Sequence, residues 1–167
     1  MTRAYARLQL LIPPDAKVLA VTAMPSLFRY GKESVFNVDI PGAASPSPGM
    51  PFFKGPSSVK EYLKQLGIGY IAYSDFDETQ CMYYRQRWRC QADAAKCGAV
   101  AATPPFCSGS PVHSARSVQP MDYGTRLAEP WKVHGAFYLD LMDNIDRLAE
   151  TENVLFCDRR LRLLRLK

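Results

Sequence analysis

Short apolar runs alternate with amphipathic segments along most of the chain. The first unit is a short helix from Thr2 to Leu11, with Ala4, Leu8 and Leu11 on one face; Pro13 and Pro14 end it. The compact apolar run Lys17 to Ala23 follows and predicts a buried strand, and Val35 to Ile40 predicts a second one. This alternation is typical of an α/β domain, and we expect a three-layer, Rossmann-like sheet.

A helix followed directly by a strand comes next. Val59, Tyr62, Leu63 and Leu66 form one apolar face of a helix from Ser58 to Leu66. Ser57 or Ser58 is the expected N-cap, since Ser58 and Glu61 have capping-box spacing, and Gly67 suits the C-terminal cap. Gly69 to Ser74 predicts the third strand. Together with the second strand this unit predicts a parallel, right-handed crossover.

The C-terminal part repeats the pattern. Trp131 to Glu150 predicts a long helix whose core face carries Phe137, Leu141, Ile145 and Leu148, with Met142 beside them, while Asp140, Asp143 and Asp146 lie off that line. Asn153–Cys157 and Leu161–Leu166 flank a polar turn. They predict an antiparallel hairpin that extends the sheet.

Two segments interrupt this regular pattern. Residues 41–56 hold five prolines, which excludes a regular element, and the apolar patch Met50 to Phe53 either packs on the body or contacts a partner. Residues 77–130 are predicted to be an insertion into a single domain spanning residues 1–167. The insertion opens with a helix from Glu78 to Cys97, capped by Asp77 and closed by Gly98, and continues as a chain rich in Pro, Ser and Gly.

The cysteines fall mainly inside this insertion. Four of the five occur within 27 residues: Cys81, Cys90, Cys97 and Cys107. They either form disulfides, which would indicate an oxidising compartment, or stay reduced as small apolar groups. We expect at least one disulfide among them. A continuous helix would keep Cys90 from pairing with Cys97, because seven residues span about 10 Å. Cys157 is expected to be reduced and buried.

Charge adds one open question. The formal net charge is +5, and five basic residues occupy the last nine positions. They either protect a solvated strand edge or meet an anionic surface, of which a lipid bilayer is the candidate and specific nucleic acid is not expected. The longest fully aliphatic run, Leu10 to Ile12, is far shorter than the roughly 20 residues that cross a bilayer.

Motifs for common chemistries are missing from the sequence. The turn after the first strand, Ala23 to Ser26, has no glycine, which disfavours a dinucleotide site, and neither a P-loop nor a G-x-S-x-G elbow occurs. His113 and His134 have no ligand pattern around them and are interpreted as structural. The alternation of arginines with aromatic residues from Tyr83 to Arg89 either stacks bases or is an amphipathic helix on its own core. No metal, cofactor or catalytic residue is predicted.

A candidate binding rim does follow from the topology. Open α/β sheets bind ligands at the carboxyl ends of their strands. The residues expected there are Met24, Ser26, Tyr30, Ser74 and Asp75. Asp75 with Asp77 and Glu78 either forms a site for a metal or sugar hydroxyls, or simply starts a helix.

Three stretches together resemble a known family. They are I-P-P-D-A-K-V-L-A-V near the N-terminus, S-S-V-K-E-Y-L-K-Q-L-G-I-G-Y-I-A-Y in the middle, and V-L-F-C-D-R-R-L-R-L-L-R-L at the end. This order is similar to the soluble C-terminal domain of bacterial polytopic membrane glycosyltransferases of the GT-C type. The resemblance covers residues 5–76 and 131–167 and does not extend across residues 77–130.

The resemblance implies an accessory, non-catalytic domain on the periplasmic face of the inner membrane. Its partners would be a membrane region of the same parent protein and a carbohydrate or lipid-linked sugar, and the catalytic acid of such enzymes lies in the membrane part. The clustered cysteines fit a periplasmic location. The chain starts with its own Met1, which departs from this pattern. The alternatives are a free-standing carbohydrate- or small-ligand-binding module, and an independent α/β enzyme with its site in the insertion.

Overall fold

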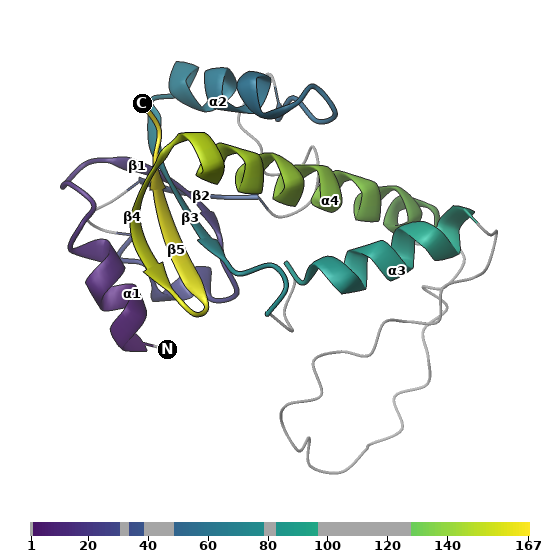
Figure 1. Cartoon of the computed structure of the whole chain (residues 1–167), viewed down its shortest axis with the longest axis horizontal. Helices are drawn as coiled ribbons and strands as arrows, with labels where there is room; N and C mark the ends of the chain where they lie inside the picture. The colour runs from purple at the N-terminus through teal and green to yellow at the C-terminus, as the bar shows by residue number, and fades with distance from the viewer. Residues whose placement is uncertain (1, 31–33, 39–48, 79–82, 97–127) are drawn as a thin grey trace, which may run out of the picture.

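The protein has a mixed α/β fold, seen in a computed structural model that describes residues 2–30, 34–38, 49–78, 83–96 and 128–167 (Figure 1). The described part contains four helices and one five-stranded mixed sheet. In chain order the elements are α1 (Thr2–Gln9), β1 (Lys17–Val21), a 3-10 turn (Pro25–Leu27), β2 (Ser34–Asn37), α2 (Pro56–Gln65), β3 (Ile68–Ser74), α3 (Arg85–Lys96), α4 (Ala128–Thr151), β4 (Asn153–Asp158) and β5 (Leu161–Arg165).

The strand order is β2-β1-β3-β5-β4. β1 lies between β2 and β3 and pairs in parallel with both, so the predicted parallel relation of the second and third strands is confirmed. β5 runs antiparallel to β3 and pairs with β4 in the predicted hairpin, which extends the sheet. The strand ends differ from the predictions by one to three residues, and Ile40 lies outside the described residues.

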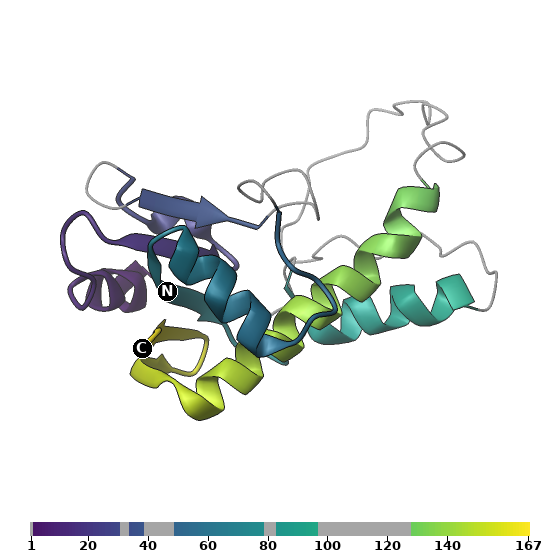
Figure 2. The same cartoon turned by 90° about the horizontal axis from the view of Figure 1, so that it is seen from above.

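Helices lie on both faces of the sheet, and β1 shows why (Figure 2). Its alternate residues point to opposite faces. Val18 and Ala20 join the core under α1, while Leu19 and Val21 join the larger core under α2 and α4. The apolar run therefore reflects burial on both faces, as expected for a parallel strand.

The ends of α1 and α2 differ from the sequence predictions. α1 stops at Gln9, and Leu11, predicted to lie on its core face, is 44% exposed; Tyr5 and Leu8 make the buried contacts. α2 begins at Pro56 after Gly55, with no side-chain cap, so the predicted capping box is wrong. Proline suits the first helical position because its φ is already helical and its missing N–H is not needed there.

The other end of α2 agrees with the prediction. Gly67 adopts a φ of 73°, and its N–H donates to the Lys64 carbonyl at 2.9 Å. This left-handed conformation favours glycine and turns the chain directly into β3.

The predicted start of α3 is wrong. The helix begins at Arg85 instead of Glu78, and Asp77 does not cap it. The Asp77 N–H donates to Asp75 Oδ1 at 3.1 Å, and the Arg85 N–H donates to the Phe76 carbonyl at 2.9 Å. The Asp75 side chain thus closes a local turn that competes with the helix. The predicted closing residues, Cys97 and Gly98, lie outside the described part.

α3 packs along α4, and this pair extends away from the sheet (Figures 1 and 2). The buried Trp88 ring stacks on Tyr138 with centroids 4.3 Å apart. Gly135 allows the close approach, because a Cβ there would lie 3.1 Å from the Trp88 carbonyl oxygen. The Arg-aromatic stretch is therefore an amphipathic helix on its own core, the second of the two interpretations.

α4 starts three residues earlier than predicted, and its core face is confirmed. Leu141, Met142, Ile145 and Leu148 are buried. Phe137 contacts Phe52 and Phe53, with ring centroids 4.8 and 5.0 Å away. Met50 is buried in the larger core and Phe52 packs against it, while Phe53 stays 60% exposed, so the patch is mostly packed within the domain.

Candidate functional site

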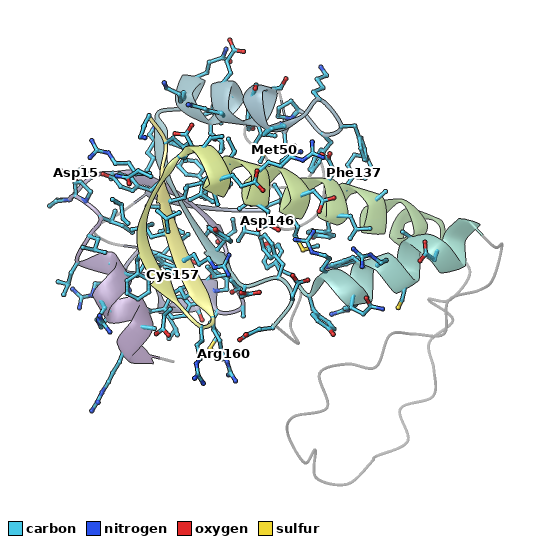
Figure 3. All side chains as sticks on the ribbon, viewed as in Figure 1. Asp15, Met50, Phe137, Asp146, Cys157 and Arg160 are labelled. Carbon is cyan, nitrogen blue, oxygen red and sulfur yellow. The ribbon has the colours of Figure 1, made fainter. Side chains whose placement is uncertain are left out.

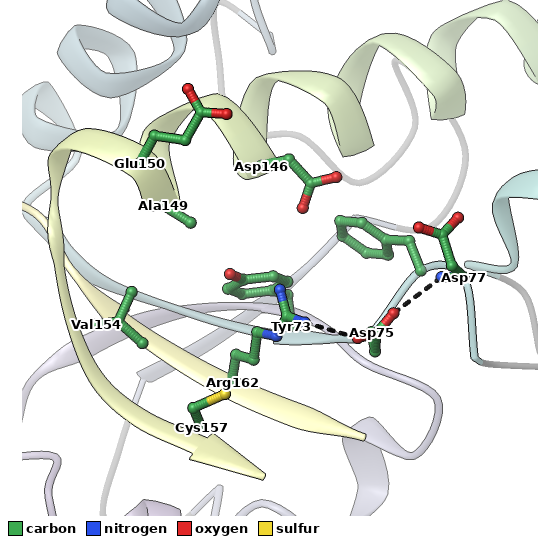
Figure 4. A pocket seen from close by; sticks show the side chains of 10 residues that line it. Tyr73, Asp75, Asp77, Asp146, Ala149, Glu150, Val154, Cys157 and Arg162 are labelled. Atoms are coloured by element: carbon green, nitrogen blue, oxygen red, sulfur yellow. Dashed lines mark hydrogen bonds and ion pairs between the residues drawn. The ribbon is translucent and has the colours of Figure 1, made fainter. Parts of the chain in front are cut away.

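A pocket of about 440 Å³ opens between the carboxyl end of β3, the second half of α4 and the β4–β5 hairpin (Figure 4). In Figure 3, Asp146 lies on α4 and Cys157 on the hairpin, at two sides of this region. The lining residues are Tyr73, Asp75, Phe76, Asp77, Asp146, Ala149, Glu150, Val154, Cys157 and Arg162. Its size falls within the range of small-molecule sites.

A β-bulge sets the hairpin side of the pocket. Val154 pairs with Leu164 and Phe156 with Leu163, so Leu155 is the extra residue on β4. The bulge shifts the alternation of side chains by one position. As a result Val154 and Cys157 both line the pocket, and Leu155 and Phe156 pack against the α1 side of the sheet.

Tyr73 forms the floor. It is 1% exposed, and its hydroxyl makes no well-formed hydrogen bond with a described residue, although Arg162 lies near enough to act on it. In Figure 4 this hydroxyl points toward the side where Ala149 and Val154 lie. Burial raises the pKa of Tyr73, while nearby Arg162 opposes the rise. The Tyr73 ring lies 5.5 Å from that of Phe76, so two aromatic rings border the cavity.

Arg162 stands opposite Tyr73 on the neighbouring strand. Its guanidinium donates to Asp75 Oδ2 at 2.7 Å and lies 5.9 Å from the centre of the Tyr73 ring. Burial lowers the pKa of Arg162, but Tyr73 and Asp75 outweigh that effect and raise it overall. The Arg162 Nε is buried with no partner in the described part of the chain.

A second guanidinium, Arg85, holds the upper edge. It forms ion pairs with Asp77, at 3.2 Å, and with Asp143 and Asp146 on α4. Burial lowers the pKa of Arg85, but these carboxylates raise it overall. Burial also raises the pKa of Asp146 above its ordinary value, more than Arg85 lowers it. These three ion pairs, referred to as the Arg85 clamp, therefore connect α3 to α4 beside the pocket.

The pocket is acidic. Four carboxylates and one guanidinium line it, which is a formal charge of −3. Arg85 and Asp143 form an ion pair just outside the lining, and their opposite charges leave the net charge of −3 unchanged. Glu150 is exposed at the margin of the lining, and in Figure 4 its carboxylate points away from Tyr73 and Arg162. The arrangement suits a ligand that donates hydrogen bonds or carries positive charge.

The sequence-predicted rim is only partly brought to this pocket. Asp75 lines it, but Ser74 is buried and its Oγ accepts the Ala23 N–H at 2.9 Å. Met24, Ser26 and Tyr30 follow β1 and are not among the lining residues. The Tyr30 hydroxyl donates to the Pro25 carbonyl at 3.1 Å, so it stabilises its own loop.

Most of the pocket was not foreseen from the sequence. The sequence pattern does not indicate Tyr73, Phe76, Asp146, Ala149, Glu150, Val154, Cys157 or Arg162, and it indicates Asp77 only together with Asp75 and Glu78. One signal was present, since Asp146 and Glu150 are one helical turn apart and flank the small Ala149. The hairpin residues carry no comparable signal, because their direction depends on the bulge.

Two of the five cysteines lie among the described residues. Cys90 and Cys157 are free, and both are exposed, so the predicted burial of Cys157 is wrong: the bulge turns it toward the pocket. Cys81, Cys97 and Cys107 lie outside the described residues, as do His113 and the side chain of His134. Among the described residues, no three His, Cys, Asp or Glu side chains are grouped to hold a metal ion.

No protein-family model matches the chain, and neither curated proteins nor solved structures match it. None of the helices in the described ranges has the length and apolar character needed to cross a bilayer.

Proposed function

We propose that this chain is a carbohydrate-binding accessory domain of a GT-C-type membrane glycosyltransferase that uses a lipid-linked sugar donor. It would face the periplasm and dock on a membrane region of the same parent protein, and it would not catalyse transfer alone. The finer features of the fold, a Rossmann-like three-layer sheet with a cysteine-containing insertion and disulfide, belong to the same proposal.

The sequence frame supports the proposal. The three stretches that carry the family resemblance form β1, the α2–β3 unit and the β4–β5 hairpin. These strands are neighbours in the order β1-β3-β5-β4. The similarity therefore involves one continuous side of the sheet, the side that also borders the pocket.

The single observation that carries the binding function is the pocket itself. Asp75 and Asp146 offer carboxylate oxygens, which accept hydrogen bonds from sugar hydroxyls. The Tyr73 and Phe76 rings offer apolar surface for the C–H side of a sugar ring. The buried Tyr73 hydroxyl makes no well-formed hydrogen bond with a described residue, although Arg162 acts on it, so it keeps hydrogen-bonding capacity for a ligand hydroxyl.

Calorimetric titration with glucose and with disaccharides tests the binding function. We expect weak, saturable binding that Tyr73→Phe reduces about threefold to tenfold, because one buried hydrogen bond contributes about 1 kcal/mol. Ser26→Ala, in the predicted rim but outside the pocket, should leave the affinity unchanged. Equal losses in the two variants would contradict the assignment.

A free-standing carbohydrate-binding module is the second candidate, and the same pocket supports it. The translated sequence upstream of Met1 separates the two. Several apolar segments of about 20 residues directly before Thr2 are expected for the membrane enzyme. An in-frame stop codon with a ribosome-binding site there would reject the membrane-tethered form and leave the module.

A further inference from the structure

We propose that the domain lies with α1 and the β4–β5 turn on an anionic lipid bilayer. The contact surface, called the basic face, consists of Arg3, Arg7, Arg159 and Arg160 with Leu10 and Leu11 beside them. The inference goes beyond the carbohydrate function, because the acidic pocket lies on the α4 side of the sheet and the basic face on the α1 side.

The helix α1 has a buried side and a basic outward side. Its buried side packs on the sheet. Arg3, Arg7 and Leu10 follow one another at intervals of four and three residues, and all three are exposed, so they form one stripe on the outward side. Residues 2–14 contain no Asp or Glu, so no acid within this stretch offsets the two arginines.

The β4–β5 turn adds two more arginines at the same end of the molecule. The Arg7 guanidinium lies 5.7 Å from the centre of the Phe156 ring on β4, and α1 also contacts β5, so α1 runs beside the hairpin. In Figure 3, Arg160 points outward from the turn, at the end where Figure 1 shows the start of α1. The Arg159 N–H donates to Asp158 Oδ1 at 2.6 Å, which stabilises the turn.

The charge of the basic face is available to a partner. None of its four arginines forms an ion pair with a described residue, unlike Arg85 and Arg162 on the pocket side. Four guanidiniums and the carboxylate of Asp158 give a formal charge of +3. Asp15 lies well away from Arg160 in Figure 3. Such a surface is attracted to anionic lipid headgroups.

Two exposed leucines favour a bilayer over other polyanions. Leu10 is 80% exposed and Leu11 is 44% exposed, and both directly follow α1. Basic residues beside exposed aliphatic ones are typical of segments that lie in the headgroup region, with the aliphatic side chains at the acyl boundary. Single-stranded nucleic acids are instead bound by exposed aromatic rings on which bases stack. The partner with this chemistry is therefore lipid.

Flotation of the full chain with lipid vesicles tests the inference. The vesicles contain phosphatidylcholine alone, or phosphatidylcholine with about one third of the anionic lipid phosphatidylglycerol. We expect binding to the anionic vesicles alone, and weaker binding as salt is added, because the arginines are exposed and screened by ions. Equal binding to both kinds of vesicle, or binding to neither, would overturn the inference.

Two variants separate charge from apolar contact. Arg3→Glu combined with Arg7→Glu should weaken binding at least about tenfold, since each arginine near an anionic surface adds to the affinity. Leu10→Asn should weaken it about threefold, since less apolar surface leaves the water. Arg89→Glu combined with Arg147→Glu makes the same charge change on exposed residues of α3 and α4, and this control should bind like the wild type.

The remaining results also decide between the alternatives. Equal losses in the two charge-reversed pairs would overturn the basic face, because net charge alone would then explain binding. Equally tight binding of a short DNA duplex, with no effect of Leu10→Asn, would assign the face to nucleic acid and overturn the lipid assignment. Thermal melting shows whether each variant is folded, and the comparison of the two vesicles needs only the wild type. No sugar is present, so the carbohydrate function is tested separately by the glucose titration.

Discussion

The sheet body and the helical arm of this domain are held together in different ways. The body is the sheet with α1, α2 and the second half of α4, and its two cores bury alternate residues of the same strands. The arm is α3 with the first half of α4, joined mainly by Trp88 on Tyr138 and by the Arg85 clamp. The body thus rests on a repeated local pattern, whereas the arm joins the larger core through Tyr83, Trp88 and Tyr138, which come from segments far apart in the sequence.

The largest expected effect that separates the two regions comes from Trp88→Ala. Trp88 is fully buried, and removing such a side chain costs about 3–5 kcal/mol. We expect amide exchange to speed up along α3 while the β3–β5 amides stay protected. Arg89→Ala, on the exposed side of the same helix, is the matched control. Uniform loss of protection in both regions would show that the arm and the body unfold as one unit.

A smaller effect is expected from Arg85→Gln, which removes the cation shared by three carboxylates. The free energy of unfolding at pH 7 should fall by about 1–2 kcal/mol, because Asp146 is partly buried and the clamp joins the arm to α4. Chemical denaturation measures this loss, with Arg89→Gln as the control. A loss that matches the control would mean that the clamp contributes nothing to stability.

The pH dependence of that variant has a defined sign. The pKa of Asp146 is higher in the folded state than in the unfolded state, so protonation of Asp146 stabilises the folded state. This stabilisation is fully present below the unfolded pKa of 3.8 and is lost as the pH rises through the folded pKa. Removing Arg85 raises the folded pKa further. The difference between variant and wild type should therefore shrink as pH falls toward 4, and a difference that grows would contradict the account.

The smallest expected change in the free energy of unfolding comes from replacing Glu152, which belongs to the sheet body. This carboxylate accepts hydrogen bonds from Lys60 of α2 and from the Lys167 N–H, at 2.5 and 2.7 Å. Glu152→Gln should lower the free energy of unfolding by about 1 kcal/mol. Unlike Trp88→Ala, it should reduce protection of the β3–β5 amides. Glu150→Gln, an exposed neighbour, is the control.

The pKa of Glu152 gives a second readout. Burial raises this pKa, but the hydrogen bonds from Lys60 and Lys167 outweigh it, so the folded value lies below 4.5. Its stabilisation is thus present above the unfolded pKa and lost as pH falls through the folded one. The wild type should lose its advantage over Glu152→Gln on acidification below about pH 4.5. A pH-independent difference would show that the charge is not involved.

The same contrast explains which parts of the fold were predictable. The strands β1, β3 and β5 are predictable because burial of one or both faces of a strand leaves a recognisable pattern of apolar positions in the sequence. The starts of α2 and α3 were missed since each is decided by competition, Pro56 against the Ser58 cap and the Asp75 turn against the Asp77 cap. A single sequence shows the candidates for a cap but not which one wins.

The candidate site was less predictable than the fold. The topological rule indicates the carboxyl end of β3, and of the residues it names Asp75 lines the candidate pocket. It could not supply Asp146 and Glu150, because the packing of α4 over that edge is a tertiary result. Cys157 was predicted to be buried from its apolar neighbours, and the bulge at Leu155 reversed its direction.

Mapping of a bound ligand by NMR tests the central claim that the acidic pocket, and not the rim after β1, is the binding site. Glucose is titrated into the isotope-labelled chain, and the changes in backbone amide chemical shifts are followed. The account predicts saturable changes at Tyr73, Asp146, Glu150 and Arg162, with Met24, Ser26 and Tyr30 unchanged. Changes centred on Met24 to Tyr30, or no saturable change at the pocket, would contradict it.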